Sequence, residues 1–145
     1  MDNLGNEYEI VVDDHEFAPI LKLHFCDGRF ERKSIGYANL FDCGDALRLQ
    51  DIRISDDAIL ISRSRFFFFF ERHVQEARNF QRRGLGTELL KSVFQFARAK
   101  GYQSIVGEIV RRDLEKNPKL PEWYAKNGFA VNKTERGFDI VAQWD

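Results

Sequence analysis

The sequence predicts a single mixed domain of the α/β or α+β class, in which a mostly antiparallel sheet is flanked by helices. Three segments with alternating apolar and polar residues follow one another closely in residues 20–54, as in an antiparallel meander. A helix pattern, a strand pattern and a second helix pattern then follow in residues 85–127. A chain of 145 residues can bury one hydrophobic core, so we expect one domain over residues 1–145.

Four strands are expected in the first third of the chain. They cover residues 8–12, 20–25, 35–41 and 46–54. The first is rich in β-branched residues, and the other three alternate. Asp27-Gly28 supplies a hairpin turn after the second strand, and residues 42–45 supply the next turn.

Residues 56–79 form an atypical insertion after the fourth strand. The run AILIS can form a strand, whereas RFFFFFERHVQEARN is compatible with a strand, a helix or a loop. Five adjacent phenylalanines, residues 66–70, cannot all point one way in a strand, because successive side chains alternate between faces.

The clearest helix pattern begins at Leu85. Apolar residues recur every four positions up to Ala97, and Gly101 stands where a C-terminal cap belongs. Residues 104–110 then predict a strand and residues 120–127 a helix. Two last strands are expected in FAVNK and FDIVAQW.

Composition excludes several classes of protein. The net charge of −1 argues against a general nucleic-acid binder. Neither the cysteines nor the histidines have the spacing of a metal site, so we expect no metal. The polar amino terminus is not a signal peptide, and the longest apolar run is too short to cross a membrane, so we expect a reduced cytoplasmic setting without membrane contact.

Two glycines and two arginines stand directly before the first predicted helix, in QRRGLGT. The first backbone N–H groups of a helix have no partner within it, and glycine lets a ligand approach them. This combination predicts a phosphate site. The sequence is not a Walker A loop, because Thr87 and Glu88 follow Gly86, and Leu89 replaces the third glycine of a Rossmann fingerprint.

Two motifs in this order resemble those of the GNAT superfamily of N-acetyltransferases. QRRGLGT resembles its R/Q-x-x-G-x-G/A pyrophosphate loop. In NPKLPEWYAKNGF, Asn117 precedes Tyr124 by seven residues. Trp123, Gly128 and Phe129 complete the second motif. The resemblance covers residues 35–145 well and residues 1–34 poorly.

The resemblance implies acetyl-CoA or a related acyl-CoA as co-substrate, with its pyrophosphate at the helix start. The residues expected to contact it are Ile52, Arg53, Ile54, Gln81, Arg82, Arg83, Gly84, Leu85, Gly86, Thr87, Asn117 and Tyr124. Within this set, a backbone N–H of residues 52–54 is expected to meet the thioester carbonyl oxygen, as on the family's splayed strand. Each arginine either contacts a phosphate or is merely solvated.

The expected reaction is N-acylation of an amine by direct attack on the thioester. By resemblance, Tyr124 is the candidate acid for the leaving thiolate; its alternative role is packing. Asp51 is a candidate base because the family sometimes places a carboxylate on this strand. Glu108 is a second candidate, since a carboxylate on a predicted buried strand needs a reason. Either carboxylate can instead be structural, and water can carry the proton.

Two departures from the family are expected. The early helices between its first two strands are missing here, and residues 56–79 are inserted before the loop. The insertion either packs over the sheet or walls an acceptor pocket or a subunit interface.

These departures leave the acceptor undefined: a small molecule or a peptide bearing an amine. A homodimer is left open. The alternatives in function are a non-enzymatic module that binds acyl-CoA or a partner on the same fold, and a phosphate-binding protein of another fold.

Overall fold

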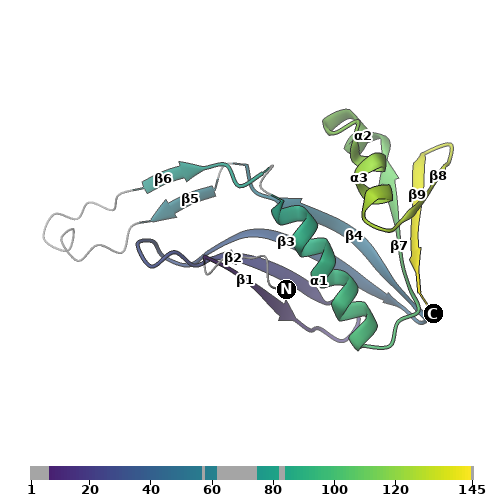
Figure 1. Ribbon diagram of the computed structural model, residues 1–145, viewed down its shortest axis with the longest axis horizontal. Coiled ribbons are helices and arrows are strands. Elements are labelled where there is room, and N and C mark those ends of the chain that lie inside the picture. Colours follow the sequence, from purple (N-terminus) through teal and green to yellow (C-terminus); the bar gives the residue numbers. More distant parts are fainter. Residues whose placement is uncertain (1–6, 57, 62–74, 82–83, 145) are drawn as a thin grey trace, which may run out of the picture.

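The computed structural model describes residues 7–56, 58–61, 75–81 and 84–144 (Figure 1). The strands are β1 (Tyr8–Asp13), β2 (Ile20–Phe25), β3 (Lys33–Cys43), β4 (Ala46–Ile54), β5 (Ala58–Ile61), β6 (Gln75–Arg78), β7 (Ser104–Val110), β8 (Ala130–Lys133) and β9 (Gly137–Gln143). The helices are α1 (Leu85–Ala99), α2 (Arg111–Lys116) and α3 (Leu120–Lys126). The expected mixed α/β class is confirmed.

A seven-stranded sheet forms the centre of the molecule, in the order β1-β2-β3-β4-β7-β9-β8. β2, β3 and β4 form the predicted antiparallel meander, and β1 adds a fourth antiparallel strand beside β2. β4 and β7 are parallel, and α1 connects them, as a parallel pair requires. The remaining pairs are antiparallel, so the sheet is mixed but mostly antiparallel.

The predicted elements agree with the structure except around residue 111. Arg111 and Arg112 follow the predicted strand, and no helix is predicted for them, but they begin the short helix α2. This helix buries none of its residues fully, so it has no apolar stripe from which it could be predicted. The ambiguous insertion contains the antiparallel pair β5–β6, a sheet separate from the large one.

One face of the large sheet carries the main core. α1 places Leu89, Val93 and Ala97 against it, as the four-residue spacing predicts. Partly buried Leu114 of α2 and buried Tyr124 of α3 join the same core cluster. The described helices therefore lie on one face of the sheet, and no described helix covers the other face (Figure 1).

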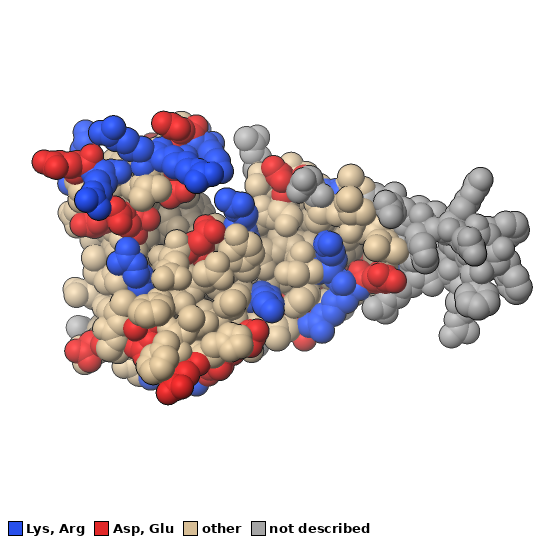
Figure 2. Space-filling model, turned by 180° about the vertical axis from the view of Figure 1, so that it is seen from behind, with Lys and Arg blue, Asp and Glu red and all other residues tan. Residues whose placement is uncertain are grey.

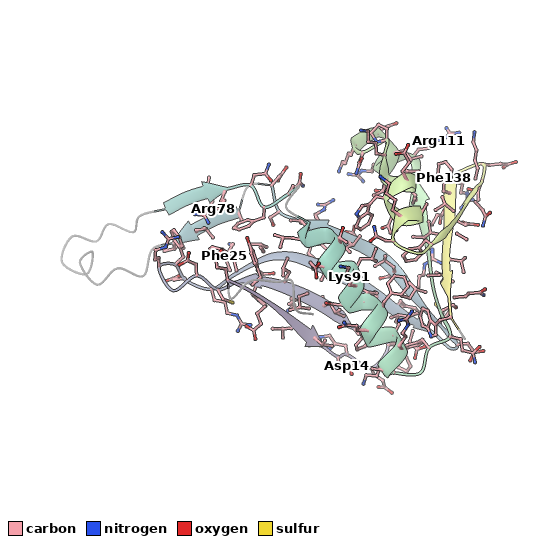
Figure 3. All side chains as sticks on the ribbon, in the orientation of Figure 1. Asp14, Phe25, Arg78, Lys91, Arg111 and Phe138 are labelled. Atoms are coloured by element: carbon pink, nitrogen blue, oxygen red, sulfur yellow. The ribbon has the colours of Figure 1, made fainter. Side chains whose placement is uncertain are left out.

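The β5–β6 pair packs at the end of the sheet beyond the start of α1. Buried Leu60 and Phe80 form a second cluster with Phe25 of β2 and Leu85 of α1. Arg78 lies over the Phe25 ring, with its guanidinium carbon 5.4 Å from the centroid, and both residues are labelled in Figure 3. The base of the insertion thus packs on the face that carries α1. The phenylalanine run, residues 66–70, lies outside the described residues.

The connection between β1 and β2 is a short irregular segment, residues 14–19, without a helix. Backbone bonds hold it along β3: the Leu40 N–H donates to the Pro19 carbonyl, and the Asp42 N–H to the Phe17 carbonyl. Residues 14–19 therefore place no helix over the sheet.

Candidate active site

The start of α1 leaves its first N–H groups available to a ligand. Gly84 stands at the N-cap position with a φ of 76°, a left-handed conformation that favours glycine. The first helical bond runs from the Glu88 N–H to the Gly84 carbonyl, at 3.1 Å. The N–H groups of Leu85, Gly86 and Thr87 precede it, so they have no partner within the helix.

Gly86 is not required by the packing of the protein. A Cβ at this position would lie 3.7 Å from the Trp123 ring and 3.8 Å from Ile54, both ordinary van der Waals distances. Its backbone also does not need glycine, because its φ is not positive. The fold therefore explains Gly84 but not Gly86, whose missing side chain leaves room for a ligand at the helix start.

The parallel strands β4 and β7 separate beside this helix start. They pair from Ala46–Ser104 to Leu49–Gly107, and pairing ends there. The next residue of β4, Gln50, is a bulge with no partner on β3. Because a bulge bends its strand, it lets β4 turn away from β7 while it stays paired with β3 up to Ile54.

The separated part of β4 points N–H groups into the space between the strands. The Ser55 N–H donates to the Ile35 carbonyl at 2.7 Å. In a trans peptide, the Ile54 carbonyl must then point away from β3, where the Gln81 side-chain amide donates to it at 3.0 Å. Within one residue of a strand, the N–H and the carbonyl point to the same side, and residues two apart repeat this direction. The N–H groups of Ile52 and Ile54 therefore face the side of β4 from which β7 has separated.

α3 is tied to the start of α1 by one side-chain bond. The Trp123 indole N–H donates to the Thr87 hydroxyl oxygen, at 3.2 Å. Because the Thr87 oxygen accepts this bond, its own hydrogen remains able to donate to a ligand at the helix start. Trp123 thus orients the Thr87 hydroxyl, and the ring also lies beside Gly86.

Tyr124 combines a buried ring with an available hydroxyl. The residue is 6% exposed, and its ring lies edge-on to Phe129, with centroids 5.3 Å apart. The hydroxyl has no hydrogen-bond partner among the described residues, and it is not one of their fully buried polar atoms. Burial, then the charges of Asp113 and Asp51, raise the pKa of Tyr124, so the phenol remains protonated.

Asp51 lies on the sheet face opposite α1. Ile52 packs against the core, so its neighbour Asp51 points the other way. Its carboxylate accepts a hydrogen bond from the Tyr37 hydroxyl, at 3.2 Å. Its charge also contributes, after burial and Asp113, to the raised pKa of Tyr124.

Glu108 points to the same far face but is bound differently. It stands between the core residue Ile109 and Gly107 on β7, and its side chain is 29% exposed. The carboxylate lies 3.8 Å from the guanidinium of Arg48 on β4. A half-buried carboxylate beside a cation is explained by a structural ion pair, which is the alternative to a role as a base.

Asn117 and Gln81 both support the backbone of the site. The Asn117 side-chain oxygen accepts from the Lys119 N–H at 3.2 Å, in the turn that begins α3. Gln81 holds the loop to the end of β4 through the bond to Ile54.

Two of the residues expected to contact the co-substrate, Arg82 and Arg83, lie outside the described residues. Arg53 is exposed on β4, and Leu85 is buried in the second cluster.

Three residues of the site have contacts that sequence reasoning missed. Tyr37 reaches Asp51 diagonally, two positions from its direct partner Arg53, and only the strand register reveals this. Trp123 belongs to the second motif, but the motif predicts no bond to Thr87. Asp113 lies in the first turn of α2, where its carboxylate accepts from the Val110 N–H. It belongs to a helix that the sequence pattern does not predict.

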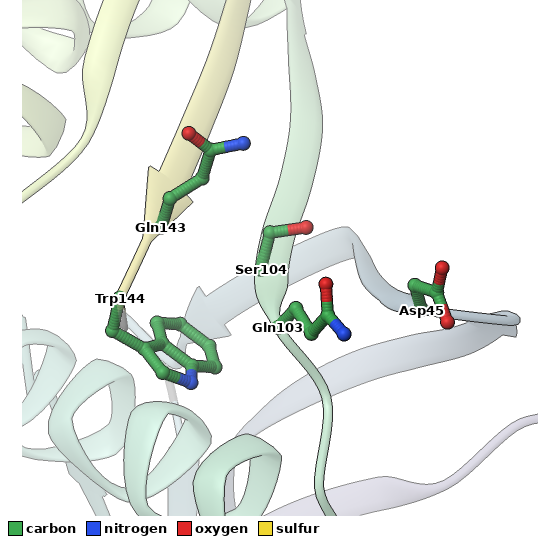
Figure 4. Close-up of a pocket in the computed structure, with 5 residues that line it drawn as sticks. All are labelled: Asp45, Gln103, Ser104, Gln143 and Trp144. Carbon is green, nitrogen blue, oxygen red and sulfur yellow. The ribbon is translucent and has the colours of Figure 1, made fainter.

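A depression lies at the opposite end of the sheet from the start of α1, where β7 begins and β9 ends (Figure 4). Asp45, Gln103, Ser104, Gln143 and Trp144 line it. It contributes no residue to the site around Gly84.

Among the described residues, no group of acids, histidines and cysteines could hold a metal ion. None of the described helices has the length and apolar character needed to span a membrane.

Residues 7–129 match the model of the acetyltransferase (GNAT) family. Similar solved structures include the PaiA N-acetyltransferase from Thermoplasma acidophilum in complex with coenzyme A, at 17% identity and a TM-score of 0.59, over 88% of this chain and 62% of that one. A GNAT family acetyltransferase from Elizabethkingia anophelis with acetyl-CoA bound is 12% identical, with a TM-score of 0.61 over 96% and 99% of the two chains. Nourseothricin acetyltransferase is 14% identical, with a TM-score of 0.57 over 92% and 69%. At these identities the structures share the fold alone.

No curated protein matches the sequence. The family match covers most of the chain, including the loop before α1 and the motif around Tyr124. The chain therefore belongs to the acetyltransferase (GNAT) family.

Proposed function

We propose that the protein transfers an acetyl or related acyl group from acyl-CoA to an amine. The observation that carries this proposal is the separation of β4 from β7 directly beside the start of α1. A thioester in this gap would have hydrogen-bond donors on one wall and Tyr124 on the other. Two substrates held together in such a gap react as if in one molecule.

The start of α1 fits the pyrophosphate of coenzyme A. The N–H groups of residues 85–87, the helix dipole and the Thr87 hydroxyl all favour an anion there. Gly86 leaves room for it without any structural need of its own. Similar folds have been solved with coenzyme A or acetyl-CoA bound, which supports the same class of co-substrate here.

The reaction forms a carbon–nitrogen bond, breaks a carbon–sulfur bond and moves one proton from nitrogen to sulfur. The N–H groups of Ile52 and Ile54 stabilise the carbonyl oxygen as it gains charge. Tyr124, still protonated, donates to the sulfur as the thiolate leaves.

A carboxylate on the far face receives the proton from the amine. Asp51 fits this role better than Glu108, because its only described bond is to a neutral hydroxyl, whereas Glu108 lies near Arg48. The amine therefore enters from the sheet face opposite α1. We also propose a reducing cytoplasmic setting, which the free thiols of Cys26 and Cys43 support.

A combined binding and turnover screen tests the proposal. Acetyl-CoA should raise the stability of the fold, by about 2.7 kcal/mol at a hundredfold excess over its Kd. Free coenzyme A should be released when amines from a panel of small molecules and peptides are added. Stabilisation without release over the whole panel would instead favour a non-enzymatic module that binds acyl-CoA.

A further inference from the structure

A basic surface lies at the end of the molecule formed by α2, α3 and β8. Residues 110–136 contain seven lysines and arginines against four acids, although the whole chain carries a net charge of −1. Figure 2 views the sheet face opposite α1, and blue side chains gather at this end, bordering a hollow in the surface. Positive charge is therefore concentrated here, while the rest of the molecule is net acidic.

Four exposed cations define the α2 basic surface. They are Arg111, Arg112, Lys116 and Lys119. Arg111 is labelled in Figure 3. None of the four forms an ion pair with any described residue. Their charges are not neutralised within the described protein, so they can act on a ligand.

The α2 basic surface begins where β7 ends, next to β7 residues that point to the face from which the amine would enter. On β7, Glu108 and Val110 point to the far face, and Arg111 follows Val110 in the chain. The next residue of α2 after the arginines, Asp113, acts electrostatically on Tyr124. A molecule whose amine reached the gap from the far face would pass the α2 basic surface.

The chemistry of this surface selects among acceptors. One carboxylate or phosphate needs only one or two cations, whereas these four extend over residues 111–119, so the partner carries several spaced negative charges. Glu115 stands among the cations, and Asp51 and Glu108 lie on the adjoining face. A nucleic acid, with a charge every ~1.7 Å along the duplex, would meet these acids. An acidic peptide can place neutral residues opposite them.

We propose that the α2 basic surface binds an acidic peptide segment that carries the acceptor amine. This inference rests on the proposed function and names its acceptor class. It assigns the pyrophosphate of the co-substrate to the start of α1 and the negative charge of the acceptor to α2, so the two anions occupy different sites.

Two lysine peptides of equal length test the inference, one with glutamates around the lysine and one with glutamines. The glutamate peptide should have a KM about tenfold lower at low ionic strength, and salt should remove most of the difference. Fluorescence anisotropy of the labelled peptides measures binding separately from turnover. Equal KM and equal affinity for the two peptides would overturn the inference.

Charge-reversal variants locate the effect. Arg112→Glu and Lys119→Glu should each raise the KM of the glutamate peptide about threefold to tenfold, with a smaller change for the glutamine peptide. Lys33→Glu is the matched control, because Lys33 is exposed, free of ion pairs with described residues and on β3. It changes the net charge equally and should leave both KM values unchanged. An equal effect of Lys33→Glu would overturn the inference.

The remaining outcomes separate this inference from the proposed function. Acidic-peptide binding that depends on Arg112 but gives no acetylation supports the surface and contradicts the acyl transfer. Acetylation of small amines with no preference for the glutamate peptide supports the acyl transfer and contradicts the role of the surface. A weaker acetyl-CoA affinity in Arg112→Glu, with peptide KM unchanged, assigns the surface to the co-substrate and overturns the inference. Transfer RNA bound more tightly than the glutamate peptide also overturns it.

Discussion

The Tyr37 hydroxyl donates a hydrogen bond to the Asp51 carboxylate, at 3.2 Å, across β3 and β4. Tyr37 is half-buried on the sheet face opposite α1, and burial, then the Asp51 charge and this bond, raise its pKa. The bond fixes the carboxylate at the point where β4 has just separated from β7. Tyr37 is thus a positioning residue for the candidate base.

The first prediction concerns this pair. Asp51→Asn should lower the pKa of Tyr37, because a negative charge that disfavours the phenolate is removed. Ultraviolet titration of tyrosinate, with Tyr37→Phe to assign the signal, measures the shift. Tyr37→Phe should also lower kcat/KM severalfold, because the carboxylate loses the bond that holds it beside the separated strands. An unchanged kcat/KM would leave the bond with a purely structural role.

The second prediction concerns Tyr124. Tyr124→Phe keeps the packed ring and removes the hydroxyl, so turnover should fall about 100-fold while acetyl-CoA affinity stays near that of the parent. Because the pKa of Tyr124 is raised, its protonated form persists above the ordinary tyrosine value of about 10. The kcat should therefore show no Tyr124-dependent loss up to about pH 10. A descending limb below that pH, abolished by the substitution, would contradict this assignment.

The third prediction uses two glycines of the same loop as a matched pair. Gly84→Ala should destabilise the fold by about 1 kcal/mol, because its φ of 76° is costly for alanine. Gly86→Ala should leave stability nearly unchanged, since a Cβ there meets only ordinary contacts. It should nevertheless weaken acetyl-CoA binding, which isothermal titration would measure. Normal affinity in Gly86→Ala would remove the argument that this glycine makes room for the pyrophosphate.

The fourth prediction concerns the Trp123–Thr87 bond. Trp123→Phe and Thr87→Val should each weaken acetyl-CoA binding severalfold, because the oriented hydroxyl is lost in both. The double variant should bind no more weakly than Thr87→Val, since the indole acts through that hydroxyl. Additive losses in this cycle would show that the two side chains act independently.

Patterns with a fixed period predicted most of the fold. The four-residue spacing from Leu85 to Ala97 and the alternation in residues 20–25 each reflect burial of one face, and both elements have the expected positions. α2 has no such pattern, because its contact with the core comes from Leu114, which is only partly buried. The β5–β6 pairing could not be predicted either, since the partners of two short strands depend on long-range contacts.

The sequence motifs predicted that the start of α1 and Tyr124 of α3 belong to the site, but they did not predict the geometry of either. Gly84 and Gly86 are both glycines of one loop, and the sequence does not distinguish them. The structure does: Gly84 has a left-handed backbone, whereas neither backbone nor packing requires glycine at position 86. Similarly, Asp51 and Glu108 are both carboxylates on strands. Their difference lies in their partners, Tyr37 and Arg48, which the strand register brings near them.

The last prediction concerns the base of the insertion. Phe80 is fully buried, 5.1 Å from the Phe25 ring, in the cluster that also holds Leu85 at the start of α1. Phe80→Ala should therefore cost about 3–5 kcal/mol in the free energy of unfolding, measured by urea denaturation. It should also weaken acetyl-CoA binding at temperatures where the fold is intact, because Leu85 loses support next to the candidate pyrophosphate site.

Ile59→Val on β5 is the control for Phe80→Ala. Ile59 is 48% exposed, and valine keeps the branched side chain, so stability should change by about 0.5 kcal/mol or less. If Phe80→Ala were as mild as Ile59→Val, the β5–β6 pair would contribute little to the fold. If it destabilised the protein but left acetyl-CoA affinity unchanged, the insertion would support the sheet without supporting the site. Loss of both would identify the β5–β6 pair and Phe80 as the support of the helix start.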